Sequence, residues 1–460
     1  MENLNPVHYL SKRSDCNLLR KFMAIIILSL NLTSAKQIFS GGYEWAGLGA
    51  KALGKGGAFI GEVSDWTAIY WNPAGLLQLS KFGAGFSLVN NNTLMYDGNS
   101  FRNFDTPSTF DPLTETYRYD PQNLQDLDQN DVFARVYYTE PDRFDLKDNK
   151  VRSINPNIGL HYNTEKWAIG VGAYIPIGNI TELEDRINDT QIGSEIQGIY
   201  KNLFYIRVIT ANFAYRITDF FYLGVGINIL HMNLETEIEK FYKAPLYLPQ
   251  ELQQLNYSLK STYEVSGDDY EGAIGFLLKL NPNFQIGGIY RTGATLKLKG
   301  RSDYIPGGSL TLGSSSESSD VTQSFPMPST YGVGAFYRLN EDLSANIDFY
   351  RTSWSGFKAD IDFEHEGEAL QDRSTNFGWK NSIRLRFGIE YEYTEKLTLR
   401  AGTSYDQTAI QDRHYSLTFL VTPDIIGYIT GIGYRITNSI LLDAAVSYAN
   451  SSTIVEGVKY

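Results

Sequence analysis

The stretch from Ser382 to Tyr393 alternates apolar and polar residues with almost no exception. Every second residue is apolar, and these residues share one face of an extended chain: Ile383, Leu385, Phe387, Ile389, Tyr391 and Tyr393. Charged residues such as Arg384 and Glu390 occupy the opposite face. A helix, with about 3.6 residues per turn, cannot separate residues in this way, whereas a β-strand repeats every two residues. The pattern therefore predicts strands with one apolar and one charged face.

The same alternation recurs in pairs along the chain. We expect six hairpins with tight turns near residues 163, 217, 282, 340, 394 and 437. The connections between hairpins are longer and polar, at 91–150, 237–260, 300–325 and 357–378. Short turns at one end and long loops at the other are typical of an outer-membrane β-barrel. A soluble β-sandwich also alternates, but aromatic residues at the strand ends and an N-terminal export signal favour the barrel.

Residues 1–35 read as a signal peptide. Lys12, Arg13, Arg20 and Lys21 precede an apolar run at 22–32, and small residues follow it at 33–35. The run is too short for a membrane-spanning helix, which needs about 20 residues. A buried N-terminal helix would explain the apolar run but not the flanking charges and the cleavage site. We therefore expect export, with the only cysteine, Cys16, lost on cleavage.

Composition excludes several classes of function. The net charge of −12 argues against a nucleic-acid partner. The five histidines are scattered, and no catalytic triad, metal-ligand cluster or redox motif is recognisable. We expect a protein that is not an enzyme and that needs no metal or cofactor. Aromatic residues are abundant at 14%, which suits strands that place rings at a membrane–water boundary.

The predicted strands number thirteen, beginning with the run at 82–90. An antiparallel barrel closes with an even number of strands. The segment 453–460 is the remaining candidate for a short closing strand, or else the sequence is incomplete there. We therefore predict an all-β, transmembrane antiparallel barrel over residues 81–460, with about fourteen strands.

A glycine-rich segment at 36–80 precedes the first strand, and we expect it to form a hatch, or plug, inside the barrel lumen. Glycines allow tight turns and close packing in a confined space. The segment ends in Asn72, Pro73, Ala74 and Gly75. These four residues are candidates for gating, and an entry turn before the first strand explains them equally well.

The chain resembles the FadL/TodX family of outer-membrane transport proteins for long-chain fatty acids and other hydrophobic compounds. The resemblance lies in residues 47–59, 72–75, 213–216, 224–228, 351–355, 399–406, 422–424 and 431–434. It implies a fourteen-stranded barrel, an N-terminal hatch and a hydrophobic ligand that leaves through a lateral opening. This chain departs from the family pattern after residue 448, where a full closing strand does not fit comfortably.

Three groups of residues are candidates for the transport pathway. In the resembled family the third strand is kinked beside the lateral opening, so we assign that role to Pro176 and Gly178, with a simple strand end at Ile175 as the alternative. Leu248, Leu252, Leu255 and Leu259 repeat at helical spacing and predict an amphipathic loop helix that captures apolar ligand, or packs on the rim. Arg384, Arg386 and Arg400 face the lumen, where they bind a ligand carboxylate or hold the hatch by ion pairs.

We therefore predict a channel for passive uptake of hydrophobic compounds, either long-chain fatty acids or aromatic hydrocarbons. The expected location is the cell outer membrane, with outer-membrane lipid and lipopolysaccharide as neighbours and a monomeric state. The alternative is a barrel of the same fold that acts in protein interaction or as a secretion shuttle.

Overall fold

The computed structural model describes residues 47–94, 110–111, 116–117, 147–189, 194–243, 256–308, 315–409 and 424–450. The predicted signal peptide and residues 36–46 of the predicted hatch lie outside these ranges, as does the candidate closing strand at 453–460. No helix within the described residues is long and apolar enough to cross a membrane.

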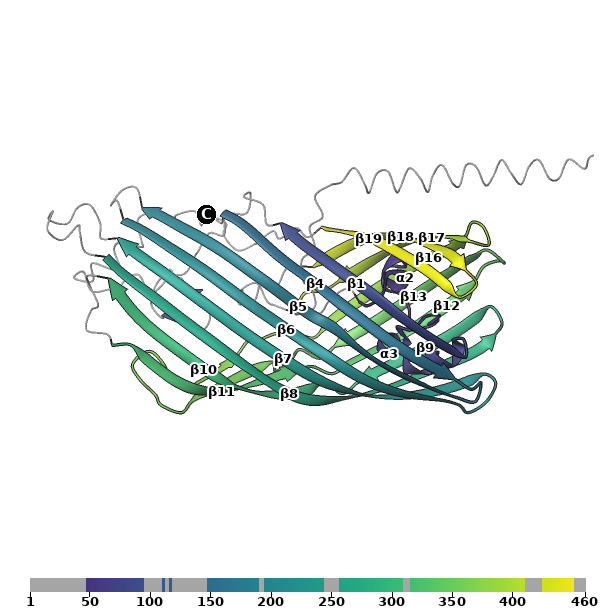
Figure 1. Cartoon of the computed structure of the whole chain (residues 1–460), viewed down its shortest axis with the longest axis horizontal. Coiled ribbons are helices and arrows are strands. Elements are labelled where there is room, and N and C mark those ends of the chain that lie inside the picture. The colour runs from purple at the N-terminus through teal and green to yellow at the C-terminus, as the bar shows by residue number, and fades with distance from the viewer. Residues whose placement is uncertain are drawn as a thin grey trace, which may run out of the picture.

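Seventeen antiparallel strands form one sheet that curves around the molecule (Figure 1). The continuous strands are β1 (Phe82–Leu94), β4 (Lys147–Asn163), β5 (Trp167–Asp189), β6 (Ser194–Arg216), β7 (Phe221–Lys243), β8 (Asn256–Asn281), β17 (Leu397–Asp406), β18 (Ile425–Thr437) and β19 (Ile440–Asn450). Two short strands, β2 (Phe110–Asp111) and β3 (Thr116–Tyr117), pair only with each other in the described part of the chain.

Four further crossings are each broken into two strands. They are β9 (Phe284–Arg291) with β10 (Ala294–Gly308), β11 (Glu317–Met327) with β12 (Thr330–Arg338), β13 (Leu343–Thr352) with β14 (Lys358–Phe363), and β15 (Arg373–Asn376) with β16 (Ser382–Glu392). Nine continuous and four broken crossings give thirteen crossings within the described residues. Neighbours in this series pair in chain order, from β1 with β4 to β18 with β19.

All six predicted hairpins are present, as β4–β5, β6–β7, β8–β9, β12–β13, β16–β17 and β18–β19. Their turns gather at one end of the sheet, which we call the turn end, and we call the opposite end the loop end. Three predicted loops are wrong in extent. Strands β7 and β8 run through much of 237–260, β10 and β11 through much of 300–325, and β14 and β15 lie within 357–378. Loop 91–150 lies mostly outside the described residues.

Near the turn end the sheet is apolar outside and polar inside. Leu385 and Phe387 are 43% and 46% exposed, whereas Arg384 and Arg386 are 8% and 3% exposed. A soluble sandwich would bury the apolar face and expose the charged one. Exposed aromatic residues, including Tyr162, Trp167, Tyr215 and Tyr337, lie next to the hairpin turns. The strands therefore carry the surface of a membrane barrel here.

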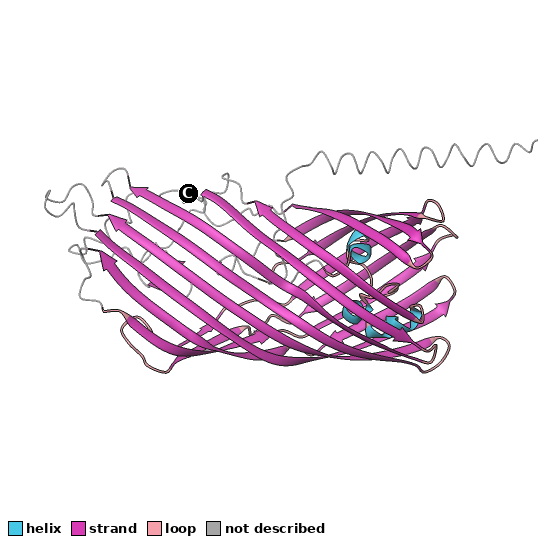
Figure 2. Cartoon of the chain, in the orientation of Figure 1, coloured by secondary structure: helices cyan, strands magenta, loops and turns pink. Residues whose placement is uncertain are grey.

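Residues 47–80, which we call the hatch segment, contain α2 (Ala50–Gly54), α3 (Ala68–Trp71) and a 3-10 helix, η1 (Pro73–Gln78). These helices lie at the turn end (Figure 2). Helix α2 contacts β17, β18 and β19, whereas η1 contacts β5 to β8. The hatch segment thus touches strands from both halves of the sheet, and most of its residues are buried.

Candidate functional site

The alternation of apolar and polar residues changes phase partway along the long strands. On β7, Val225, Ile227 and Ile229 are exposed on the outer face, but the next apolar residues, Leu230 and Met232, are buried. The adjacent pair Ile229-Leu230 marks the change. Beyond it the outer face of β7 continues with polar residues. We call this point the polarity inversion.

Strand β6 inverts at the matching position. Ile209 is exposed on the outer face, whereas its neighbour Val208 and then Ile206 are buried. Val208 pairs with Leu230 of β7, so the two inversions lie at one level of the sheet. On the loop-end side of this level, β6 and β7 place apolar side chains such as Phe204 and Leu234 inside and charged side chains such as Arg207 and Glu235 outside.

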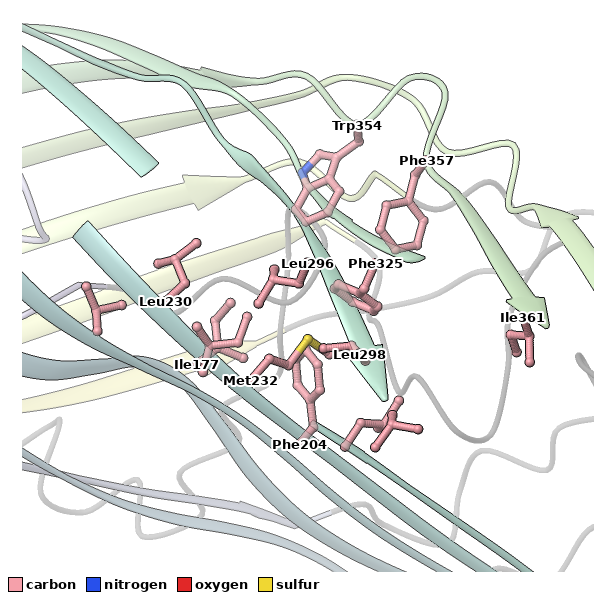
Figure 3. Close-up of a cluster of buried hydrophobic side chains, with 14 of the residues drawn as sticks. Ile177, Phe204, Leu230, Met232, Leu296, Leu298, Phe325, Trp354, Phe357 and Ile361 are labelled. Carbon is pink, nitrogen blue, oxygen red and sulfur yellow. The ribbon is translucent and has the colours of Figure 1, made fainter. Parts of the chain in front are cut away.

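The apolar interior side chains form one buried cluster, which we call the outer cluster (Figure 3), and Trp66 and Tyr70 of the hatch segment pack against it. It includes Ile177, Phe204, Leu230, Met232, Leu296, Leu298, Phe325, Trp354, Phe357 and Ile361. The rings of Phe204 on β6 and Phe325 on β11 lie 5.9 Å apart, although these strands are not paired neighbours. Side chains from strands that are not neighbours therefore meet in the interior of the barrel.

The breaks in β13–β14 and β15–β16 supply the aromatic part of the outer cluster. Residues 353–357 and 377–381 lie opposite each other, between the β13–β16 ladder on one side and the β14–β15 ladder on the other. The two ladders have the same register, so the two breaks are equally long. The ring of Phe357 stacks on that of Trp379 at 4.5 Å, and Trp354 meets Trp379 at 5.1 Å. The sequence interpretation missed the outer cluster because it assumed one polarity along each strand. The adjacent apolar pairs Val208-Ile209 and Ile229-Leu230 are the signal that identifies it.

The predicted gating residues, 72–75, form the start of η1. Asn72 Nδ2 donates to the carbonyl oxygen of Ile60 at 3.1 Å and to that of Phe276 on β8 at 2.9 Å. Its Oδ1 accepts from the backbone N–H of Ala74, which caps η1, and Pro73 occupies the first turn. A side chain at Gly224 of β7 would collide with Pro73 and Ala74. Asn72 therefore ties the hatch segment to the wall.

A second tie joins the hatch segment to β13. One carboxylate oxygen of Asp348 accepts the backbone N–H groups of Phe59 at 2.6 Å and Ile60 at 2.8 Å. Lys55 Nζ contacts Glu62 at 2.9 Å and Asn346 at 3.2 Å. Burial would raise the pKa of Glu62, but the ammonium groups of Lys55 and Lys51 outweigh it and hold that pKa below its usual range. Glu62 therefore stays ionised in this buried setting.

The three predicted lumen arginines divide into two environments. Arg400 donates to Glu390 at 2.5 Å and to Asp443 at 2.6 Å, beside Gly54 of α2. Arg386 forms a bidentate pair with Asp406, at 2.5 and 2.6 Å. Arg384 donates to Thr352 Oγ1 at 3.3 Å and lies over the ring of Tyr350.

Arg384 and Arg386 line a small cavity between the hatch segment and the wall. Arg291, which the sequence interpretation did not select, lines the same cavity and donates to the backbone oxygen of Tyr70. Arg291 is the last residue of β9, directly before the break in that crossing. Arg400 does not line this cavity.

Pro176 and Gly178 lie at an irregularity of β5. The strand does not end at Ile175 but continues to Asp189, with a register shift against β6 between Tyr174 and Ile177. On its other side, β5 loses its ladder with β4 between the pairs Ile158–Ala173 and Arg152–Ile180. A side chain, Asn157 Oδ1, accepts the N–H of Ile175 at 3.0 Å in this interval. We call this interval the β4–β5 gap.

A small cavity lies beside the β4–β5 gap. It is lined by Leu48 and Tyr70 of the hatch segment and by Asn157, Tyr174 and Pro176 of the wall, among others. Tyr174 pairs with Val208, so the gap lies at the level of the polarity inversion.

The predicted capture helix is wrong at its C-terminal end. Leu259 lies in β8, where residues 256–265 pair with β7, so this part of the segment is a strand although its leucines have helical spacing. Residues four apart also lie on one face of a strand. Leu259 therefore shares a face with Tyr263 and Val265. Leu248, Leu252 and Leu255 lie outside the described residues.

A family model described as outer membrane protein transport protein (OMPP1/FadL/TodX) matches residues 31–456. Outer membrane protein P1 of Haemophilus influenzae is 24% identical over 315 residues, which cover 63% of this chain and 64% of that protein. The long-chain fatty acid transport protein of Escherichia coli (strain K12) is 21% identical over 306 residues, covering 59% of this chain and 66% of that protein. The crystal structure of a Pseudomonas aeruginosa FadL homologue superposes with a TM-score of 0.62 at 17% identity, covering 89% of this chain and 90% of that one. This last likeness shows that the fold is shared.

Proposed function

Because the chain belongs to the OMPP1/FadL/TodX family of outer-membrane transport proteins, we propose that it takes up hydrophobic compounds across the outer membrane by passive passage. Long-chain fatty acids and aromatic hydrocarbons are the compound classes that we propose. The protein is an outer-membrane β-barrel of the family fold.

The outer cluster is the observation that carries this proposal. A channel for polar solutes needs a wet, polar interior, whereas this barrel carries a large apolar cluster in its interior on the loop-end side of the polarity inversion. Apolar surface that leaves water gains roughly 25 cal/mol per Å². A hydrophobic ligand would therefore partition from the aqueous side into this interior, and an ion would not.

We propose a route from the outer cluster past the hatch segment to the β4–β5 gap. Leu48 of the hatch segment belongs to the outer cluster and also lines the cavity beside the gap. The outer surface around the gap is apolar, with Ile154, Ile158 and Ile180 each about half exposed. Pro176 and Gly178 would keep this interval unpaired, and the ligand would leave through it into the membrane.

The arginine cavity supports a preference between ligand classes. Three guanidinium groups, those of Arg291, Arg384 and Arg386, line this cavity together. A carboxylate would be held there by charge-assisted hydrogen bonds, whereas a neutral hydrocarbon gains nothing from them. Fatty acids are therefore the first ligand class to test.

The first experiment identifies what the protein carries. The full-length protein is extracted gently from the outer membrane, and its bound lipids and hydrocarbons are identified by mass spectrometry. We expect a fatty acid or a comparable apolar compound at close to one per barrel. A consistent absence of apolar ligand, together with a stable protein partner that copurifies, would favour the protein-interaction alternative.

The second experiment tests the exit. A Cβ atom at Gly178 would lie 2.6 Å from the ring of Tyr205 and 2.9 Å from Asn155, so Gly178→Leu should distort or block the gap. Gly272→Leu is the matched control, because a Cβ at that position of β8 meets only Thr292, at 3.3 Å or beyond. We expect slower uptake of radiolabelled fatty acid by cells with Gly178→Leu and unchanged uptake with Gly272→Leu. Equal uptake by both variants at equal surface levels would rule out this exit.

A further inference from the structure

Three cations follow one another on the outer face of β10. Lys297, Lys299 and Arg301 are exposed, whereas Leu296 and Leu298, which alternate with the two lysines, face inward and belong to the outer cluster. Because alternate residues of a strand share a face, the three side chains form a short row on the outside of the barrel.

The three cations differ in their neighbours. Arg301 pairs across the ladders with Glu264 of β8 and Asp320 of β11, and its Nε contacts Asp303 at 3.2 Å. Lys297 and Lys299 instead pair across the ladder with Ser324 and Thr322, and Lys299 also with Ser266. Within the described residues, neither lysine makes an ion pair. Asp268, on the outer face of β8, is engaged with His231 at 2.7 Å.

Apolar surface lies directly on the turn-end side of the two lysines. Tyr270 and Ile274 of β8, Tyr290 of β9 and Val333 of β12 are 44% to 65% exposed on the same outer face. The change from these residues to Lys297 and Lys299 corresponds to the polarity inversion on β6 and β7. In an outer-membrane barrel the loop end faces outward, so this level is the head-group layer of the outer leaflet.

We propose that Lys297 and Lys299, with the hydroxyl groups of Ser266, Thr322 and Ser324, bind the phosphate groups of a phosphorylated glycolipid in the outer leaflet. Two ammonium groups flanked by hydroxyl donors match the charge and the acceptor oxygens of a phosphate. The apolar surface below them matches the acyl chains of the same lipid molecule. Neighbouring strands therefore present a complementary surface to both the phosphate groups and the acyl chains of the lipid. This site lies outside the barrel and does not depend on a ligand in the lumen.

The test measures binding of bisphosphorylated lipid A to the full-length protein in detergent by native mass spectrometry. Lys297→Gln with Lys299→Gln should weaken binding by about thirtyfold, as expected when two cations are removed from an anionic lipid surface. The matched control is Arg301→Gln with Lys358→Gln. It also removes two outward cations, but these are already paired with Asp303 and Asp360. We expect the control to bind within about threefold of the unmodified protein.

Two further probes identify the ligand chemistry. Lipid A without its phosphates should bind as weakly to the unmodified protein as bisphosphorylated lipid A binds to the lysine variant. Inorganic phosphate alone should not compete at millimolar concentration. The proposal is overturned if dephosphorylated lipid A binds equally well, if inorganic phosphate displaces the lipid, or if the control pair loses as much affinity as the lysine pair. Altered gel mobility on heating confirms that each variant is folded before it is compared.

Discussion

The tie between Asp348 and the hatch segment gives the sharpest prediction. Asp348 is 1% exposed, and its carboxylate accepts two backbone N–H groups, from Phe59 and Ile60, that are themselves fully buried. Asp348→Ala removes the oxygen that accepts both hydrogen bonds. A buried donor left without a partner costs roughly 1–3 kcal/mol, so the two together cost about 2–6 kcal/mol of local hatch stability. The wall itself should persist, because Asp348 pairs with Gly334 and Arg386 through the backbone ladder.

Amide hydrogen exchange measures this loss residue by residue. Each 1.4 kcal/mol corresponds to a tenfold change, so the amides of residues 59 and 60 should exchange at least about thirtyfold faster in the variant. Exchange in β13 should stay slow. Asp360→Ala is the control, since Asp360 lies on β14 of the same crossing but is only partly buried and is paired with Lys358. If Asp348→Ala leaves residues 59 and 60 as protected as Asp360→Ala does, this carboxylate does not hold the hatch segment.

Two other predictions test the two environments of the wall. Ile227→Arg places a charge on the lipid-facing side of β7 and should lower the free energy of unfolding by about 2–4 kcal/mol, measured by urea titration of the protein folded into lipid vesicles. Glu235→Arg lies on the same face of β7 beyond the polarity inversion, and it should change that free energy by less than about 0.5 kcal/mol. Arg400→Met leaves Glu390 and Asp443 without their buried partner and should lower the free energy of unfolding by about 3–5 kcal/mol in the same titration. Lys358→Met breaks a solvent-accessible pair with Asp360 and should lower it by less than about 1 kcal/mol. A cost for Arg400→Met as small as that for Lys358→Met would show that these buried ion pairs contribute little.

The sequence predicts the hairpins well because two local signals coincide at each of them. Alternation defines a strand, and a short polar turn next to aromatic residues defines where it reverses, as at Asn163–Trp167 and Arg216–Phe221. Neither signal depends on distant contacts. The loops are predicted less well, since polar residues on an outer face beyond the membrane look like loop residues when the membrane boundary is unknown.

The capture helix shows a different limit. Leu255 and Leu259 are four residues apart, a spacing that fits one face of a helix and also one face of a strand. Leu259, Tyr263 and Val265 also fit a period of two, interrupted by Ser261, and the ladders with β7 and β10 decide in favour of the strand. Pairing between strands that are distant in the sequence cannot be recognised from a short stretch of residues, and for this reason the prediction of a helix at Leu259 was wrong.

The polarity inversion links the interior of the barrel to the proposed exit. On the turn-end side of it, the interior carries buried polar groups such as Asn212 and Asn228, together with the hatch segment. A hydrophobic chain that moved deeper would have to exchange apolar contacts for these polar groups, to which it offers no hydrogen bond. The β4–β5 gap lies at the level of the polarity inversion, where Tyr174 and Pro176 lie beside the amides of Asn155 and Asn157 inside and apolar residues surround it outside. The gap therefore offers a direct path from the outer cluster to the membrane, which is why we place the exit there rather than at the turn end.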